Sequence, residues 1–210
     1  MEISTQLIDN NRLSKAYSYQ GYRELLKELK ENQGTTGFNQ SEDLVYYTSL
    51  NHQRMKRLDK TLKMNERIAT EIQKIDSPQT WVVLTESWCG DAAYNIPVIQ
   101  KIAELNKHIT LRLLLRDSNP DIMDNYITNG GRSIPKLIMY NDVLEELATW
   151  GPRPVALQKI YDLWKNDPNK IPYKEFNVTL QKWYLNDKGL SVQNELSKLL
   201  ENVKEGSLIL

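Results

Sequence analysis

The spacing of hydrophobic and polar positions changes along the chain, and each change marks a new structural element. Residues 1–75 are polar and rich in helix formers, and a glycine-containing break at residues 33–37 separates two helices. From residue 41 to Ile75, apolar residues recur every three to four positions. This spacing predicts a long helix with one face on the core, which ends before the Pro-containing stretch at residues 76–78.

The middle of the chain carries the patterns of a strand, a helix and a second strand. Residues 81–85 and 109–115 are short, mostly apolar runs, which are typical of buried strands. Between them, residues 92–106 place their apolar positions on one helical face. The three elements predict a βαβ unit, in which a helical crossover makes the two strands parallel.

The second half of the chain predicts a hairpin between helices. A third helix is expected at residues 119–130, because glycine readily takes the left-handed conformation at a helix end. Residues 136–140 and 145–150 flank an Asn-Asp turn signal, so they are interpreted as two paired strands. Further helical patterns lie at residues 155–165 and 174–203.

Together these elements predict an α/β fold with a mixed sheet of four to five strands sandwiched by helices. The length of 210 residues fits one core domain with extensions. We therefore expect a helical N-terminal extension at residues 1–65 and a central domain at residues 66–165. A helical C-terminal extension at residues 166–210 is expected to pack on the central domain.

Composition narrows the possible partners. The 27 basic and 27 acidic residues cancel, so no overall field would draw nucleic acid to the chain. No apolar run is long enough for a membrane helix and the first residues lack a secretion signal, so we expect a cytoplasmic protein that does not bind membranes. One cysteine and two distant histidines, His52 and His108, predict neither a disulfide nor a metal site.

Two groups of side chains are given structural rather than binding roles. Basic residues interleave with the apolar pattern after residue 41, and we interpret them as a solvated helix face rather than a binding patch. They are Arg54, Lys56, Arg57, Lys60 and Lys63. The aromatic residues expected to pack the C-terminal helices on the core, rather than to form a ligand cage, are Trp164, Tyr173, Trp183 and Tyr184.

The single cysteine, Cys89, stands between the first predicted strand and its helix. Amide N–H groups and the positive end of the helix dipole converge at such a place, so we expect a solvent-reachable thiol with a lowered pKa. The dipole alone shifts a pKa by about one unit. Glu86 and Asp91, expected as surface and helix-start carboxylates, would oppose this shift if they lay close, and amide hydrogen bonds would have to outweigh them.

The residues around Cys89 resemble a known active site. Trp88-Cys89-Gly90-Asp91-Ala92 resembles the Trp-Cys-x-x-Cys motif of thioredoxins, with Ala92 in place of the second cysteine. Pro97 matches the proline that kinks the active-site helix of that family, and Arg132-Ser133-Ile134-Pro135 resembles the loop that carries its cis-proline. The resemblance covers about residues 70–165 and implies a thioredoxin-like fold.

The resemblance also implies roles for these residues. Cys89 would be the nucleophile and Trp88 an apolar wall beside it, with amides near Asp91 and Ala92 stabilising the thiolate. Ser133, Ile134 and Pro135 would shape the substrate groove. In this family the proline lies beside the sulfur, and the residue before it offers backbone groups to an extended substrate segment.

Two departures from the family pattern change the expected chemistry. Ala92 replaces the second cysteine, and Val83 replaces the buried aspartate that accepts its proton. The two losses agree, because a buried carboxylate without a partner is costly. We therefore predict a monothiol thiol-disulfide oxidoreductase that acts on protein disulfides or thiolated proteins through a mixed disulfide on Cys89. It would need no bound cofactor, and an external thiol such as glutathione or bacillithiol would regenerate Cys89.

An alternative remains open. The chain would then be a redox-inactive thioredoxin-fold protein that holds a partner protein or peptide in the cis-proline groove. The loss of the second cysteine favours this hypothesis. A pH titration of Cys89 alkylation distinguishes the two hypotheses. A glutathione-transferase-like enzyme fits less well, because its helical domain follows the thioredoxin fold, whereas the longer extension here precedes it.

Overall fold

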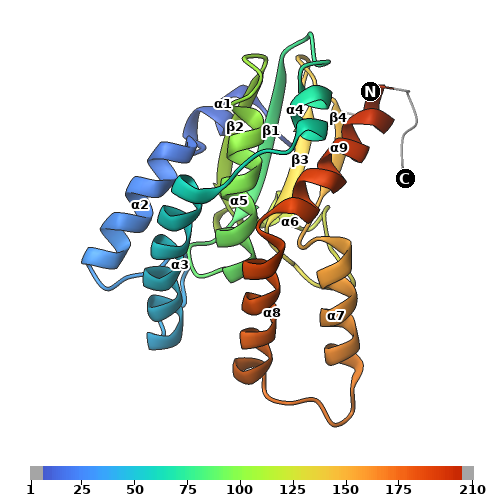
Figure 1. The fold of residues 1–210 in the computed structure, drawn as a ribbon. Helices are drawn as coiled ribbons and strands as arrows, with labels where there is room; N and C mark the ends of the chain where they lie inside the picture. Colours follow the sequence, from blue (N-terminus) through green and yellow to red (C-terminus); the bar gives the residue numbers. More distant parts are fainter. Residues whose placement is uncertain (1–6, 205–210) are drawn as a thin grey trace.

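The structure is a computed structural model that describes residues 7–204. It confirms an α/β fold around a four-stranded mixed sheet with the strand order β2-β1-β3-β4 (Figure 1). The β1–β2 pair is parallel, whereas the β1–β3 and β3–β4 pairs are antiparallel. The strands are β1 (Gln79–Thr85), β2 (Ile109–Leu115), β3 (Lys136–Tyr140) and β4 (Glu146–Trp150).

Helices precede, interrupt and follow the sheet along the chain. In Figure 1, α5 crosses the sheet, α2 and α3 lie side by side at one edge of the view, and α7 and α8 project below. The helices are α1 (Asn10–Lys15), α2 (Tyr19–Glu31), α3 (Glu42–Thr61), α4 (Glu66–Ile72), α5 (Gly90–Ala103), η1 (Arg116–Ser118), α6 (Pro120–Met123), α7 (Val155–Asn166), α8 (Tyr173–Asp187) and α9 (Leu190–Lys204). None of the helices within residues 7–204 is long and apolar enough to cross a membrane.

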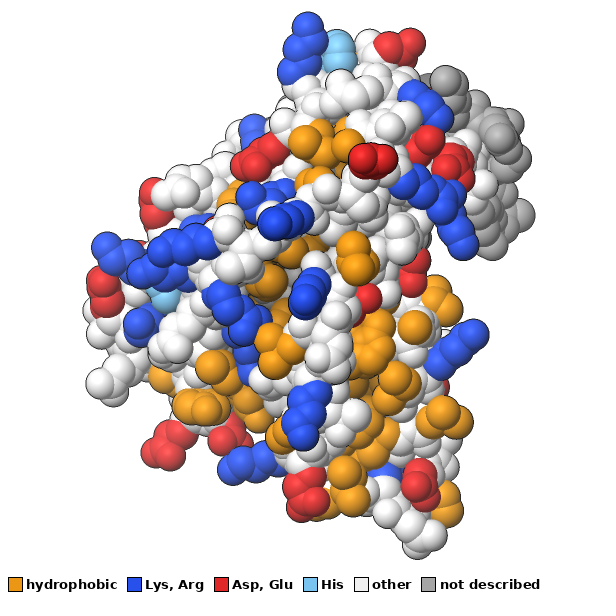
Figure 2. Space-filling model, viewed as in Figure 1, with side chains coloured by type: hydrophobic (Ala, Val, Ile, Leu, Met, Phe, Trp, Pro, Cys, Tyr) orange, Lys and Arg blue, Asp and Glu red, His pale blue; other side chains and the backbone are white. Residues whose placement is uncertain are grey.

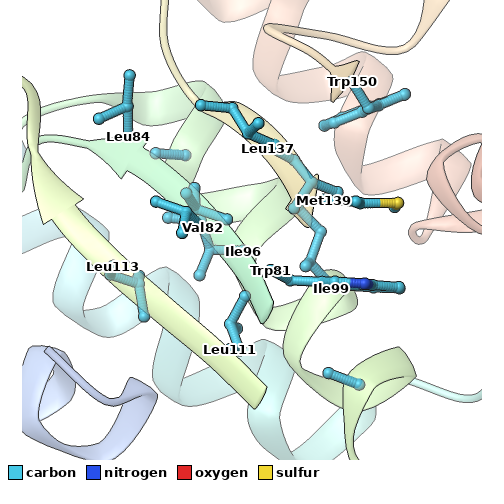
Figure 3. Close-up of a cluster of buried hydrophobic side chains, with 14 of the residues drawn as sticks. Trp81, Val82, Leu84, Ile96, Ile99, Leu111, Leu113, Leu137, Met139 and Trp150 are labelled. Atoms are coloured by element: carbon cyan, nitrogen blue, oxygen red, sulfur yellow. The ribbon is translucent and has the colours of Figure 1, made fainter. Parts of the chain in front are cut away.

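The core is built on β1, whose apolar run is buried on both faces of the sheet. Figure 3 shows Val82 of β1, Ile96 of α5 and Leu137 of β3 in one hydrophobic cluster. Fully burying a side chain of this size contributes about 1.5–3 kcal/mol to stability. The same cluster includes Leu26 of α2 and Leu196 of α9, so helices near both ends of the chain share the core of the sheet.

A second, smaller cluster joins the helices below the sheet. It contains Tyr94 of α5, Leu157 of α7, and Phe176 and Tyr184 of α8. Figure 2 shows hydrophobic side chains on the surface over the same two C-terminal helices, α7 and α8. This cluster fixes α8 against the start of α5.

Three helices differ from the sequence prediction. The long helix after residue 41 is broken, and Asn65 starts α4 by accepting a hydrogen bond from the Ile68 N–H at 2.9 Å. The helix that begins at Pro120 ends at Met123. The C-terminal helix is divided at Gly189, which has a φ of 78° and whose missing Cβ would lie 2.8 Å from a methyl group of Val98. Only glycine fits this close approach without displacement.

Candidate functional site

Cys89 lies where β1 ends and α5 begins, as the sequence predicts. Its Sγ accepts a hydrogen bond from the Ala92 N–H at 3.4 Å and donates one to the Ile134 carbonyl at 3.3 Å. The Ile134–Pro135 peptide bond is cis. The fold therefore brings the cysteine and the loop before β3 into direct contact, although 45 positions separate Cys89 from Ile134.

A pocket of about 270 Å³ opens over Cys89. Six of the eight residues predicted for the site line it: Trp88, Cys89, Gly90, Asp91, Ser133 and Ile134. Ala92 and Pro135 do not line it, although they adjoin lining residues. The other lining residues are Leu44, Tyr47, Arg54, Arg116, Arg132, Arg153, Tyr173 and Asn177. A cleft of about 700 Å³ between α2, α3 and α5 has charged walls, but Cys89 is not among its lining residues.

The thiol differs from the sequence prediction in exposure and in pKa. Cys89 is only 7% exposed, although it borders the pocket. Burial raises its pKa to about 12, and the negative charge of Asp91 adds to this shift, while the Ala92 N–H opposes it. The prediction of an open thiol with a lowered pKa is therefore wrong. The physical reason is that desolvation of a buried thiolate exceeds the roughly one unit that a helix dipole supplies.

Asp91 is a buried ion-pair partner rather than a surface carboxylate. It lies 2.6 Å from the Arg153 guanidinium and accepts a hydrogen bond from the Tyr184 hydroxyl at 2.8 Å. Burial raises the pKa of Asp91, and these two neighbours work in the opposite direction. The Arg153 guanidinium also lies over the Tyr161 ring, 4.0 Å from its centroid. This network joins the start of α5 to α7 and α8.

Glu86 also departs from the expected surface position. Its side chain is fully buried, and burial raises its pKa. One carboxyl oxygen accepts a hydrogen bond from the Asp117 N–H at 2.8 Å, whereas the other has no partner within residues 7–204.

The adjacent Ser87 hydroxyl receives hydrogen bonds from the backbone and side chain of Thr36, which ties the loop before α3 to the site.

Four arginines line the pocket: Arg54, Arg116, Arg132 and Arg153. The sequence analysis includes Arg132 in the loop that resembles the cis-proline loop, but it gives none of the four a role in the site. The prediction that Arg54 lies on a solvated helix face is wrong, because the residue is only 7% exposed. The other four members of its basic cluster, Lys56, Arg57, Lys60 and Lys63, are exposed as predicted. A signal for Arg54 existed, because it shares the buried face of α3 with Asn51 and Leu58, three and four positions away.

The C-terminal aromatic residues divide between packing and the pocket. Trp164 stacks on Phe176 with ring centroids 4.5 Å apart, and Tyr184 stacks on Tyr94 at 4.4 Å, in agreement with packing roles. Tyr173, expected only to pack, also lines the pocket. His52 and His108 do not line it. Within the described part of the chain, no group of three or more His, Cys, Asp or Glu side chains could hold a metal ion.

Comparisons with known proteins agree with this arrangement. A sequence-family model described as thioredoxin matches residues 37–165. A crystal structure of a protein of unknown function from Pseudomonas aeruginosa has a TM-score of 0.57 at 14% identity, covering 89% of this chain and 98% of that chain. The structure of an HIV epitope scaffold has a TM-score of 0.54 at 15% identity, with coverages of 89% and 99%. At these identities the two likenesses concern the fold alone. No curated protein matches the chain.

Proposed function

The chain belongs to the thioredoxin family, and from this premise we propose that it binds an extended, peptide-like ligand in the pocket over Cys89 without using a thiolate. The observation that carries the proposal is the burial of Cys89 with its S–H donated to the Ile134 carbonyl. Cys89 then holds the loop at residues 133–135 in place, and the ligand occupies the pocket beside it.

The backbone of Ile134 supports this proposal. Its carbonyl accepts the Cys89 S–H, while its N–H makes no hydrogen bond to another residue in the described range 7–204. Ile134 precedes β3, so its N–H is not used by the sheet. An extended ligand that presents a carbonyl to this N–H would satisfy a backbone group of the pocket wall.

The electrostatics of the thiol argue against redox turnover as the main activity. With the pKa of Cys89 raised to about 12, only about one molecule in 10⁵ carries the thiolate at neutral pH. The thiolate is the species that attacks a disulfide. In addition, Cys89 is the single cysteine of the chain, so no second thiol can resolve a mixed disulfide.

Monothiol exchange is the second candidate, and the position of Sγ at the pocket wall favours it. In that reaction the Cys89 thiolate would attack a disulfide of a protein or of a thiolated protein, form a mixed disulfide and release the other sulfur as a thiolate. An external thiol such as glutathione or bacillithiol would then attack the mixed disulfide and restore Cys89. This candidate requires ligand binding to lower the pKa of Cys89.

Affinity selection tests the binding proposal. A pool of end-blocked random hexapeptides without cysteine would be equilibrated with the protein, and the retained peptides identified by mass spectrometry. Ser133→Trp places a large side chain at the pocket wall. Ser77→Trp makes the same change at an exposed position before β1, at the end of the strand opposite Cys89. We expect retention by the wild type and by Ser77→Trp, and its loss in Ser133→Trp. Equal retention by all three proteins would refute binding in this pocket.

A further inference from the structure

We propose that the ligand of the Cys89 pocket carries a carboxylate that pairs with Arg54. This inference rests on the proposed function and narrows it to an acidic peptide segment. Its basis is the distribution of charge around the pocket, where one buried guanidinium lacks the anionic partner that the other arginines have.

Three of the four pocket arginines are already neutralised. Nitrogen–oxygen distances are 2.8 Å for Arg116 and Asp117, 2.6 Å for Arg132 and Asp124, and 2.6 Å for Arg153 and Asp91. Among residues 7–204, Arg54 makes no such ion pair. Its hydrogen-bond partners are the amide oxygens of Asn51, at 2.7 Å, and of Gln181.

The environment of Arg54 makes an unpaired charge unfavourable. The residue is only 7% exposed, and its guanidinium carbon lies 5.6 Å from the centroid of the Tyr94 ring. Neutral amide oxygens accept hydrogen bonds but do not compensate a full charge taken out of water. A guanidinium has five N–H donors in a planar fork, so Arg54 retains donors for a carboxylate beyond the two bonds made to Asn51 and Gln181.

Arg54 lies close enough to Cys89 to act on the same ligand. A Cβ atom built on Gly90, the residue after Cys89, would be 3.6 Å from Arg54 Nη1. Within residues 7–204, Asp91 is the only carboxylate that lines the pocket, and its oxygens are engaged by Arg153 and Tyr184. The negative charge of Asp91 acts on Arg54 through space, but within residues 7–204 no Asp91 oxygen pairs directly with the Arg54 guanidinium. The remaining N–H groups of Arg54 are therefore available to a ligand carboxylate.

Exposed aromatic residues near the pocket favour a peptide over a small acid. Tyr173, which lines the pocket, is 48% exposed. Tyr46 is 63% exposed, and its ring centroid lies 5.6 Å from that of Tyr47, which lines the pocket. Exposed aromatic side chains are enriched where proteins bind other chains, because they bury large areas on association. We therefore assign the carboxylate to an acidic side chain of a bound peptide segment.

The hexapeptide selection tests this inference through composition. Asp and Glu should be enriched over Asn and Gln by about tenfold among peptides retained by the wild type, because a charge-assisted hydrogen bond replaces a neutral one. The enrichment should fall steeply in Arg54→Met and return in part in Arg54→Lys. Arg57→Met, an exposed arginine one turn further along α3, is the matched control and should behave as the wild type. Near-ultraviolet circular dichroism verifies that each variant is folded, and the wild-type enrichment is informative by itself.

The possible outcomes separate this inference from the proposed function. The wild type could retain peptides without an acidic preference, with retention lost in Ser133→Trp. This result would overturn the pairing of a ligand carboxylate with Arg54 and leave peptide binding in place. Retention of glutarate, a small dicarboxylate without a peptide backbone, with no retained hexapeptide would support the pairing of a carboxylate with Arg54 and overturn its assignment to a peptide. If neither probe is retained, both the inference and the proposed function fail.

Discussion

Replacing Asp91 tests whether the buried ion pair at the start of α5 is charged, because the Asp91 carboxylate binds both Arg153 and Tyr184. Removing one member of a buried ion pair leaves the other charge uncompensated, which costs about 3–5 kcal/mol. Asp91 is 7% exposed and lies 2.6 Å from Arg153. We therefore expect Asp91→Asn to lower the free energy of unfolding by that amount. The exposed pair of Asp124 and Arg132 provides the control, and Asp124→Asn should cost about 0–1 kcal/mol.

Urea unfolding measures both effects. Asp91→Asn should lower the urea midpoint by more than about 1 M with an unchanged slope, whereas Asp124→Asn should barely move it. Adding Arg153→Met to Asp91→Asn should recover part of the loss, because the uncompensated guanidinium is removed with its partner. Equal and small shifts for Asp91→Asn and Asp124→Asn would refute the claim that the buried pair is charged. No recovery in the double variant would refute the claim that Arg153 causes the loss.

Three further perturbations test other parts of the site. Gly151→Ala should lower the free energy of unfolding in urea by more than about 2 kcal/mol. The reason is that Gly151 has a φ of 116° and the new Cβ would lie 2.3 Å from the Pro135 carbonyl oxygen. Gly130→Ala, also at positive φ but in open space, is the control and should cost about 1–2 kcal/mol. Burial raises the pKa of Glu86, so the folded state holds the carboxyl proton more tightly than the unfolded state does. The contribution of Glu86 to stability therefore falls as the pH rises from its pKa in the unfolded chain through its pKa in the folded protein. Glu86→Gln should therefore gain stability relative to the wild type between pH 4 and pH 7 in paired urea titrations, and a pH-independent difference would contradict the raised pKa. Tyr184→Phe, which removes the hydroxyl that donates to Asp91, should cost about 1.5–3 kcal/mol by thermal or urea unfolding, and a cost near zero would mean that this hydrogen bond does not form.

The sequence predicted the sheet well because its strands carry strong and uninterrupted patterns. The sequence pattern correctly places the apolar run that ends β1 and the residues of β3. The position of Cys89 between β1 and α5 follows from the change of hydrophobic spacing from a strand to a helix. The long helix after residue 41 was predicted without its break. Asn65, a good N-cap residue, starts a new helix there, and the apolar spacing continues across the break.

The chemistry of the site was harder to predict because it depends on burial, which single residues do not reveal. The motif located Cys89 and the loop at residues 133–135, but the pKa of the thiol depends on how much protein covers it. The buried state of Asp91 depends on Arg153 and Tyr184, which lie 62 and 93 positions further along the chain. Arg54 falls within a run of basic residues that predicts a solvated helix face, and its burial distinguishes it from the exposed members of that run.

The ionisation of Cys89 is the most direct test of the account. Because the chain has one cysteine, the rate of iodoacetamide alkylation measured by intact-protein mass spectrometry reports that thiol alone. In the folded protein the rate should still rise with pH above 10, without a plateau, because burial raises the pKa of Cys89 to about 12. In denaturant the same thiol should titrate with a pKa of about 8.5. A plateau with a midpoint below about 8 in the folded protein, under the ordinary thiol value, would contradict the account and favour monothiol exchange.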